Sequence, residues 1–375
     1  SGMDGGCVYG LFYPPANPSF SGSGLPPAIV YVHGGPTGGS PVSFNGMRNY
    51  FTSRGYAFLD VDYRGSSGFG LTYQRSMRQR WGDVDTEDML GHIDGLPAQL
   101  QAAYQLGSQL KLPPMPPVNR IVVAGMGGSA IGADLLAAYL ADQLAVPFYV
   151  HRDYGLPRYA MGEKTLLVIS SHSGDTEESL SAFEMGIANE CKILAVCTGG
   201  KLAREAEEHH VPLWKFDHSG QPRTAVGYSF GLLLALLDRL GLVTDKHSDI
   251  LDAVNVMTQL QMQIKAEIPV IQNPAKRQAG QFIGRDITIF GSGFLVPVAR
   301  RWKTQINEVA KAFASFEMLP EADHNTLAGI YHTEELIERK YAMFFDASTD
   351  LPRNRKRIAK TKEIFMLEGI ATDIF

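Results

Sequence analysis

Short apolar segments alternate with longer stretches of helical period through the centre of this chain. The apolar segments suited to β-strands are residues 121–124, 148–150, 166–169, 193–197 and 213–215. Successive parallel strands need a crossover connection, usually a helix, whereas antiparallel strands can be joined by a tight turn. The alternation therefore predicts an α/β fold whose parallel sheet is covered by helices on both faces.

Further predicted elements flank this sheet. We expect an amphipathic helix at 96–110, a mostly apolar helix at 224–243 that serves a buried core or a dimer contact, and a connecting helix at 247–267. A strand at 287–291, followed by a Gly-Ser-Gly turn, begins a second α/β unit, and a strand at 341–347 continues it. By contrast, residues 1–30 are rich in Gly, Pro and Ser and are predicted to be loose.

The first central strand ends in a glycine-rich turn, within the segment VVAGMGGSAIGADLL at 122–136. Glycine lets the backbone approach a ligand closely, and the helix that follows offers unpaired N–H groups and a positive dipole end. With the hydroxyl of Ser129, the turn at Gly128 suits an anion. The glycine spacing matches neither the dinucleotide fingerprint nor the Walker A loop. A turn that binds nothing is the alternative.

A second turn of this kind follows the strand in TLLVISSHSGDTEES, residues 165–179. Ser171, Ser173 and Thr176 crowd it, although a helix needs only one hydroxyl residue as its N-cap. Turns that follow parallel strands meet at one edge of the sheet, where ligands of open α/β sheets bind. We therefore predict that the two turns form an uncharged cradle for a phosphate group.

Composition excludes several classes of protein. The 375 residues suggest about two to three domains, and the net charge of −5 argues against a nucleic-acid partner. No apolar run is long enough to span a membrane, and we find no signal peptide at the N-terminus. Cys7, Cys191 and Cys197 lack the spacing of a metal site, which favours a reducing, cytoplasmic location.

The first part of the chain resembles the peptidase domain of the prolyl oligopeptidases, in their acylaminoacyl-peptidase branch. The resemblance covers residues 24–88 and rests on PPAIVYVHGGPTGG, YFTSRGYAFLDVDYRGSSGFG and RWGDVDTED. The first two of these segments contain predicted strands at 28–32 and 57–61. Such a domain continues with a G-x-S-x-G nucleophile elbow, an acid and a histidine.

The hydrolase resemblance ends before any nucleophile elbow. Ser129 lacks the second glycine of that motif, and His33 is interpreted as part of a turn rather than as a base. We therefore expect residues 1–88 to be an incomplete α/β-hydrolase fragment without a catalytic triad. Strands without their partners leave open sheet edges, so this fragment is expected to be poorly packed.

From Asp88 onward the chain resembles the bifunctional phosphoglucose/phosphomannose isomerases of the sugar-isomerase (SIS) fold group. The motifs are GMGGSAIGADLL, SSHSGDTEES, GQPRTAVGYSFG, NEVAKAFASFEMLPEADHN and LPRNRKRIAKTKEI. This resemblance implies two doubly wound parallel-sheet units, and we place the domains at 1–88, 89–268 and 269–375. It also implies a later helix with an active-site lysine. Lys360 and Lys362 lie on an earlier helix, so we expect the second unit to be truncated.

Aldose–ketose isomerisation needs a base, a group that opens the sugar ring and positive charge for the enediolate. The resemblance implies that Glu308 is the base, that His324 moves the ring-oxygen proton and that Arg223 lies beside the enediolate. It implies a homodimer in which His324 serves the neighbouring subunit. The alternatives are a solvated helix glutamate for Glu308 and a salt bridge for Arg223. The residues that match the phosphate binders are Gly128, Ser129, Ser171, Ser173 and Thr176.

The sequence therefore predicts an isomerase that interconverts glucose 6-phosphate, and also mannose 6-phosphate, with fructose 6-phosphate. The resemblance implies no metal and no organic cofactor, and no nucleic-acid or membrane partner is expected. Two other functions stay open: a sugar-phosphate-binding SIS protein with impaired catalysis, and a serine peptidase based on residues 24–88.

Overall fold

The computed structural model describes residues 7–19, 21–32, 39–40, 42–63, 66–70, 73, 88–330 and 334–375. They belong to two compact units, Ser1–Gly91 and His92–Phe375, and each is described here by itself. His33, assigned above to a turn, and most of the segment RWGDVDTED lie outside the described residues. In the described ranges, no helix is both long and apolar enough to cross a membrane.

The first unit contains a three-stranded sheet in the order β1-β3-β2. β3 (Ala57–Asp62) is central, parallel to β2 (Ala28–Val32) and antiparallel to β1 (Tyr9–Tyr13). The prediction that residues 1–30 are loose is wrong for β1. This strand exists because β3 supplies backbone hydrogen-bond partners from about fifty residues away, and local composition carries no signal of such pairing.

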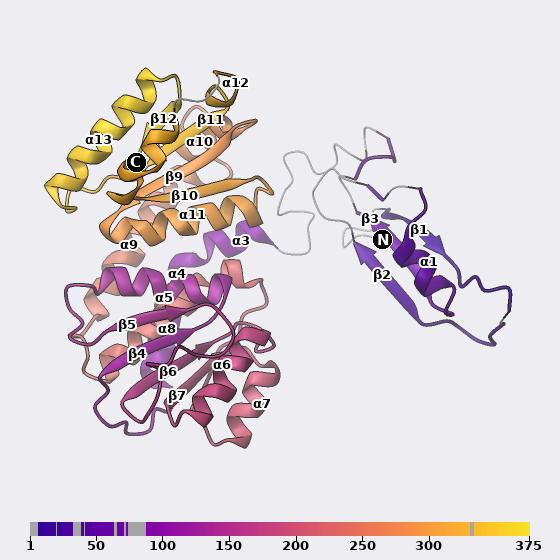
Figure 1. Ribbon diagram of the computed structural model, residues 1–375, viewed down its shortest axis with the longest axis horizontal. Coiled ribbons are helices and arrows are strands. Elements are labelled where there is room, and N and C mark those ends of the chain that lie inside the picture. Colours follow the sequence, from indigo (N-terminus) through magenta and orange to yellow (C-terminus); the bar gives the residue numbers. More distant parts are fainter. Residues whose placement is uncertain are drawn as a thin grey trace. The chain divides into compact units, whose positions relative to one another are not determined.

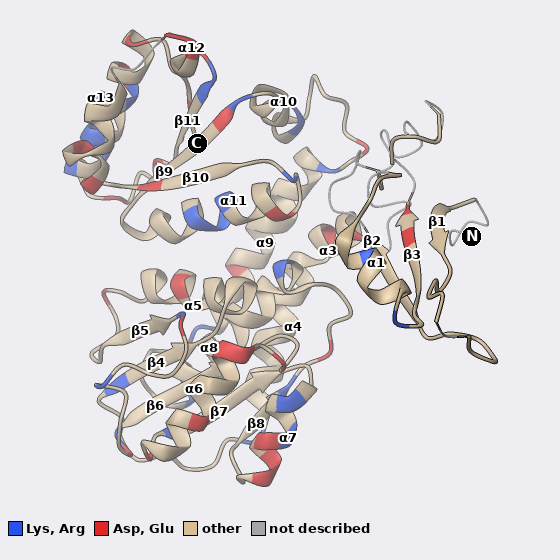
Figure 2. Ribbon diagram, turned by 45° about the vertical axis from the view of Figure 1, so that its right-hand side comes forward, with Lys and Arg blue, Asp and Glu red and all other residues tan. Residues whose placement is uncertain are grey.

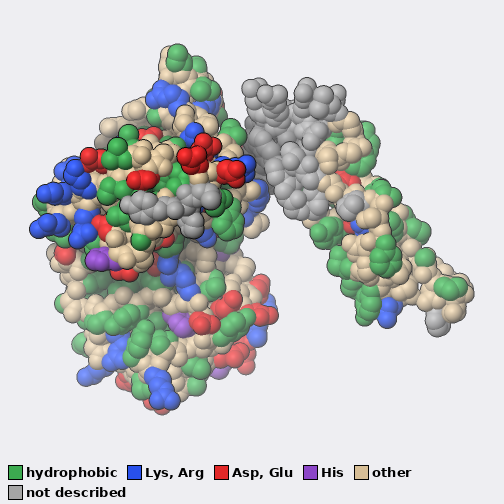
Figure 3. All heavy atoms as spheres, turned by 45° about the horizontal axis from the view of Figure 1, so that its top comes forward, with side chains coloured by type: hydrophobic (Ala, Val, Ile, Leu, Met, Phe, Trp, Pro, Cys, Tyr) green, Lys and Arg blue, Asp and Glu red, His purple; other side chains and the backbone are tan. Residues whose placement is uncertain are grey.

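In the described part of the first unit, several large apolar side chains are exposed. Arg48 of helix α1 (Gly46–Thr52) is buried and forms an ion pair of 2.9 Å with Asp60 and a hydrogen bond of 2.8 Å with the Tyr13 hydroxyl. Val30 and Phe44, however, are 58% and 86% exposed. Apolar side chains cover much of the visible face of this unit (Figure 3). The described part of the unit is therefore stabilised more by polar contacts than by a large core.

The first sheet of the second unit has five parallel strands in the order β5-β4-β6-β7-β8. They are β4 (Arg120–Ala124), β5 (Phe148–His151), β6 (Thr165–Ser170), β7 (Lys192–Cys197) and β8 (Leu213–Lys215). Every one begins and ends within one residue of its predicted bounds. The uninterrupted burial of β6 fits the rule that parallel strands are apolar on both faces.

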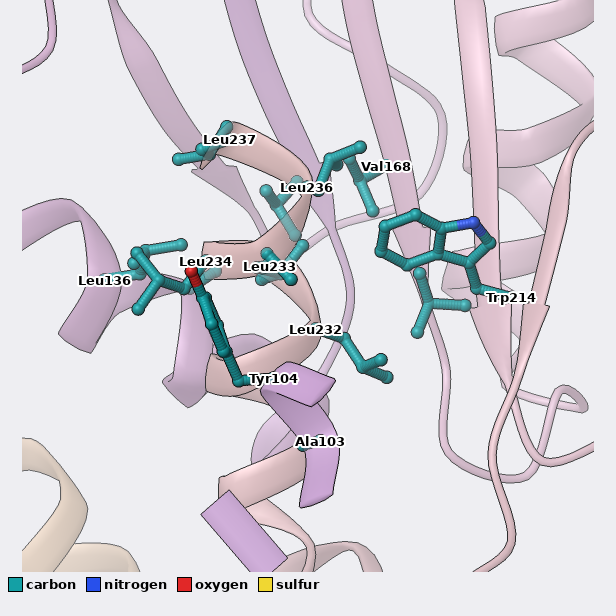
Figure 4. Packing of buried hydrophobic residues seen from close by; sticks show 14 of the residues in the cluster. Ala103, Tyr104, Leu136, Val168, Trp214, Leu232, Leu233, Leu234, Leu236 and Leu237 are labelled. Carbon is teal, nitrogen blue, oxygen red and sulfur yellow. The ribbon is translucent and has the colours of Figure 1, made fainter. Parts of the chain in front are cut away.

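Helices cover both faces of this sheet (Figure 1). They are α4 (Leu96–Gln109), α5 (Gly127–Tyr139), α6 (Glu177–Ala188), α7 (Gly200–Glu208) and α8 (Val226–Arg239), with the short α3 (Met89–Asp94) and the 3-10 turn η1 (Pro222–Thr224). α8 is the apolar helix predicted at 224–243, and its run from Leu232 to Leu237 is buried beside Trp214 and Tyr104 (Figure 4). It therefore serves the core of this unit.

The second sheet has four parallel strands in the order β10-β9-β11-β12. Its strands are β9 (Asp286–Ser292), β10 (Ala314–Leu319), β11 (Lys340–Phe344) and β12 (Ala371–Ile374). α9 (His247–Ile264) connects the two sheets and packs on the core of the first. The helical elements that follow are α10 (Pro274–Phe282), η2 (Gly293–Leu295), α11 (Val296–Glu308), η3 (Glu321–His324), η4 (Thr326–Ile330), α12 (Glu334–Ile337) and α13 (Pro352–Leu367).

Two strands of the second sheet, β10 and β12, have no counterpart among the sequence predictions. β10 has the sequence ASFEML, in which Ser and Glu interrupt the apolar pattern, and it lies at the edge of the sheet beside β9. β12 is a four-residue edge strand beside β11. Edge strands are short and half-solvated, so their hydrophobic signal is weak.

A pair of glycine substitutions tests the close packing of α8 on α4. A Cβ atom on Gly231 would lie 2.9 Å from the Cβ of Ala103, whereas a Cβ on Gly280 of α10 would meet no atom within 4 Å. We expect Gly231→Ala to lower the free energy of unfolding by about 1–3 kcal/mol through overpacking. The control Gly280→Ala should raise it by about 0.4–1 kcal/mol. Urea unfolding measures both, and equal effects would contradict the close packing.

Candidate functional site

The two hydroxyl-bearing turns meet at the carboxyl edge of the first sheet. β4 and β6 are parallel neighbours, and the turns that follow them lead into α5 and α6. The backbone N–H of His172 donates to the Ser129 hydroxyl at 3.0 Å, and the Ser170 hydroxyl donates to the Ser129 carbonyl at 3.1 Å. The structure thus brings the two predicted turns into direct contact.

Three hydroxyls of these turns each accept one hydrogen bond. Ser129 accepts from His172 N, Ser173 accepts from Asp175 N at 3.2 Å, and Thr176 accepts from the Ser171 hydroxyl at 3.1 Å. Across the described residues, no acceptor is found for the hydrogens of these three hydroxyls. They are therefore positioned as hydrogen-bond donors for a further group.

Ser171 differs from the other three hydroxyl residues. Its side chain is buried, donates to Thr176 and accepts from the Gly174 N–H at 3.1 Å. Gly174 itself has a positive φ of 76°, and an added Cβ would lie 1.9 Å from the Gly199 carbonyl oxygen. Ser171 thus builds the turn. Together with the N-termini of α5 and α6, the donors around it suit an anion.

The glycine turn also contacts the segment that carries Arg223. An added Cβ on Gly128 would lie 2.4 Å from the carbonyl oxygen of Pro222, so only glycine allows this approach. The Ser229 hydroxyl donates to the Gly128 carbonyl at 3.2 Å. Arg223 therefore follows directly after a residue that packs on the predicted anion turn.

Helix α11 holds the same segment from the other side. Arg301 donates to the Arg223 carbonyl oxygen, and Gln305 donates to the same oxygen at 3.1 Å. Glu308 lies on the same helix face, one turn further along, and its carboxylate is 3.7 Å from Nη1 of Arg223. The Arg223 side chain is 19% exposed and that of Glu308 is 40% exposed. The structure thus pairs two predicted site residues from distant parts of the sequence.

Positive charge surrounds the Glu308 carboxylate. Burial lowers the pKa of Arg301 to about 10, while the negative charge of Glu308 acts in the opposite direction. The Arg301 guanidinium therefore stays protonated at neutral pH. Arg300, next along α11, pairs at 3.0 Å with Asp134 of α5, which also pairs with Arg152. Figure 2 shows Lys and Arg positions in blue along the ribbon of α11. The Arg300–Asp134 pair ties this helix to α5.

His324 lies on η3, which follows β10 in the chain. It ends η3, and its side chain is exposed. Among the described residues, no hydrogen bond or ion pair joins it to Glu308 or Arg223. The structure therefore pairs the predicted base with the predicted arginine, whereas no contact of either with the predicted ring-opening histidine is found among the described residues.

Sequence reasoning missed two histidines of this site, His172 and His218. The Nε2 atom of His172 lies 3.0 Å from Nδ1 of His218. A histidine in the middle of the serine-rich turn was the available signal for His172. For His218 the sequence contains no such signal, because only the tertiary structure brings this residue to the turn.

The chain also contains a G-x-S-x-G pentapeptide, Gly227–Gly231, although the sequence analysis recognised no nucleophile elbow. It lies inside α8, and no strand leads into it. Ser229 is 8% exposed, and its hydroxyl donates to Gly128 and Val226 carbonyls. A nucleophile elbow needs a sharp strand-to-helix turn with an exposed serine. This match is therefore a helix-packing feature.

The candidate site is identified by the polar side chains that meet there rather than by the size of a cavity. A cavity of about 860 Å³ has mainly apolar walls from α4, α5, α8 and α9 and from the second-sheet elements η2, α11 and α13, and none of the predicted site residues lines it. Gly128, Ser129, His172 and Pro222 border a space of about 10 Å³, which suits one water molecule. In the described ranges of the chain, no group of three or more His, Cys, Asp or Glu side chains could hold a metal ion.

Comparison with known proteins adds relatives for both parts of the chain. The family model described as the bacterial phospho-glucose isomerase C-terminal SIS domain matches residues 271–374. A bifunctional phosphoglucose/phosphomannose isomerase of Caldicellulosiruptor bescii is 35% identical over 288 residues, which are 76% of this chain and 84% of that protein. A protein of the same description from Aquifex aeolicus is 30% identical over 255 residues, 68% of this chain and 75% of that protein.

Two further matches concern the N-terminal part and the fold. A model of the prolyl oligopeptidase family matches residues 42–105, which overlaps the hydrolase-like segment. A hypothetical protein from Thermus thermophilus aligns with a TM-score of 0.59 at 16% identity, over 81% of this chain and 82% of that one. Likeness at this identity concerns the fold alone. With the parallel sheets and the SIS-domain match, it confirms the predicted α/β fold class.

Proposed function

The chain belongs to the bifunctional phosphoglucose/phosphomannose isomerase family, and on that premise we propose that it interconverts glucose 6-phosphate and mannose 6-phosphate with fructose 6-phosphate. Family membership makes it a sugar-phosphate isomerase, and the choice of these substrates is the proposal. The observation that carries it is the Arg223–Glu308 pair of 3.7 Å beside two donor-rich turns.

Glu308 is proposed as the base that moves the proton between C1 and C2. Its carboxylate takes the C2 proton of the open-chain aldose, and the electron pair moves through C1 to its oxygen, which gives an enediolate. The proton then returns to C1, while the O2 proton passes to O1, so the ketose has the same atoms. Arg223 faces this charge with a planar guanidinium, which can offer two donors at once.

The two hydroxyl turns are proposed as the phosphate site. Ser129, Ser173 and Thr176 keep O–H donors, and the helices α5 and α6 begin there. A phosphate dianion has only acceptors, so a cradle of donors matches its chemistry. Ser171 acts through the turn that it holds, and Gly128 allows the Arg223 segment to approach the phosphate.

His324 is proposed to open the sugar ring from a neighbouring subunit. The exposed position of this side chain on η3 supports the idea, because an exposed histidine is available to a second copy of the chain. The proposal therefore includes a homodimer, and a cytoplasmic location is proposed with it. The domain limits at residues 88 and 268 stay predictions.

Hydrolysis by the first unit is not part of the proposal. Among the described residues, no exposed serine stands in a G-x-S-x-G sequence, because the pentapeptide of that pattern, Gly227–Gly231, is buried in α8. Labelling of the intact protein by a fluorophosphonate probe would reverse this judgement and favour a serine hydrolase.

Removing the donor hydroxyls tests the phosphate site. The double variant Ser173→Ala, Thr176→Ala should weaken fructose 6-phosphate binding strongly, since each lost hydrogen bond to a charged group costs about 1.5–3 kcal/mol. Calorimetry measures the change in Kd. Ser248→Ala on the remote helix α9 is the control and should leave Kd unchanged. Equal Kd values for the double variant and the unaltered protein would contradict the assignment.

Replacing the proposed base tests the chemical step. Glu308→Gln keeps the size of the side chain, so the fold and sugar-phosphate binding should persist, while exchange of the C2 hydrogen with solvent deuterium should fall by more than about a hundredfold. NMR of the sugar measures the exchange. The exposed Glu335 of α12 provides the control Glu335→Gln, which should exchange normally. Undiminished exchange in Glu308→Gln would remove this residue from the mechanism.

Mixing two inactive variants tests the shared site. If His324 acts across the dimer, Glu308→Gln and His324→Ala subunits combine into heterodimers that contain one intact site. Random mixing makes half of the dimers mixed, so about one quarter of the unaltered activity should return. A coupled assay for fructose 6-phosphate measures it, with each variant alone as the control. Failure to recover activity in verified heterodimers would assign His324 to its own subunit or to no site.

A further inference from the structure

A hydrogen-bonded chain of side chains connects the second hydroxyl turn to the Arg223 segment. The backbone of His172 is fixed at both ends, because its N–H donates to Ser129 and its carbonyl accepts from the Thr198 hydroxyl at 2.7 Å. Its Nε2 atom lies 3.0 Å from Nδ1 of His218. The other ring nitrogen of His218, Nε2, lies 3.4 Å from the hydroxyl of Thr224, the residue after Arg223.

The hydroxyl of Thr224 determines the tautomers of both rings. This hydroxyl donates to the Gln221 carbonyl at 2.8 Å, so it accepts from Nε2–H of His218. Nδ1 of His218 then has no hydrogen and accepts from Nε2–H of His172. Both rings are therefore neutral Nε2–H tautomers, and every donor in the chain faces an acceptor.

The surroundings of the rings favour these neutral forms. Burial lowers the pKa of His172. Burial, followed by the charges of His172 and His92, lowers the pKa of His218 to about 4, against a weaker opposite effect of the Gly220 backbone. The titratable groups that face His218 are these two histidines and Tyr228, whose rings lie 5.2, 5.1 and 5.9 Å away between centroids.

We infer that His172 and His218 are positioning residues that, as a neutral hydrogen-bonded pair, hold the phosphate turn and the Arg223 segment at a fixed separation. This inference rests on the proposed function, since the two groups held in register are the phosphate cradle and the arginine for the enediolate. Neither ring is needed to touch the sugar. Double protonation would leave two cations face to face and break the link.

A conservative substitution separates positioning from mere packing. The side-chain amide of glutamine can place a donor where His172 has Nε2, whereas alanine cannot. We expect His172→Ala to raise the Kd for fructose 6-phosphate and to lower kcat, each by about tenfold or more, because small displacements of positioning groups are costly. His172→Gln should restore both to within about threefold of the unaltered protein. The exposed His209 of α7 gives the control His209→Ala, which should change neither.

NMR of the imidazole nitrogens tests the pair without turnover. Both rings should be Nε2–H tautomers at pH 7, and in His172→Gln the titration midpoint of His218 should rise, because the charge of the neighbouring ring is gone. The inference would be overturned if the rings were Nδ1–H tautomers or if both rings titrated independently near the ordinary histidine pKa. It would also be overturned if the His172→Ala protein had normal Kd and kcat. The unaltered protein could bind fructose 6-phosphate without converting it. The proposed function would then fail, but the tautomers and the Kd values would still test whether the His172–His218 pair positions the two segments.

Discussion

The backbone carbonyl of Arg223 is the point on which the proposed site depends. Two side chains of α11, Arg301 and Gln305, donate to this one oxygen, and the same helix face carries Glu308. The segment before it packs on Gly128 so closely that a single methyl group would not fit. A helix of the second sheet and a turn of the first sheet thus hold the arginine between them. The proposed base and arginine are consequently held next to the turn that is proposed to bind phosphate.

Electrostatics and hydrogen bonding support this arrangement in different ways. The Arg301 guanidinium keeps its charge at neutral pH because its pKa, although lowered by burial, is still about 10, and the negative charge of Glu308 acts against the lowering. The hydroxyl turns, by contrast, contain no cation: they offer O–H groups and the ends of two helices. The proposed chemistry uses these two kinds of group for different tasks. The dianionic phosphate is bound by several neutral donors, whereas the transient enediolate faces a fixed cation.

The first unit is stabilised in a different way from the second. Its three strands place apolar side chains such as Val30 in solvent, and a buried Arg48–Asp60 pair supports the packing of α1 on β3. Burial raises the pKa of Asp60, while the charge of Arg48 acts in the opposite direction. A buried ion pair adds little net stability when compared with apolar packing of the same volume. The isomerase chemistry proposed here draws only on residues of the second unit.

The sequence by itself determined the parallel strands and helices of the first sheet, because the strands are mostly apolar segments and the turns after them carry glycine and hydroxyl residues. It also named the site residues that stand in recognisable motifs, whose roles are still predictions. It could not find β1, β10 or β12, since short strands with mixed polarity exist through pairing with distant partners. Only the tertiary structure decided that Glu308 lies beside Arg223 and that His218 lies beside His172, because separation along the chain carries no information on such contacts.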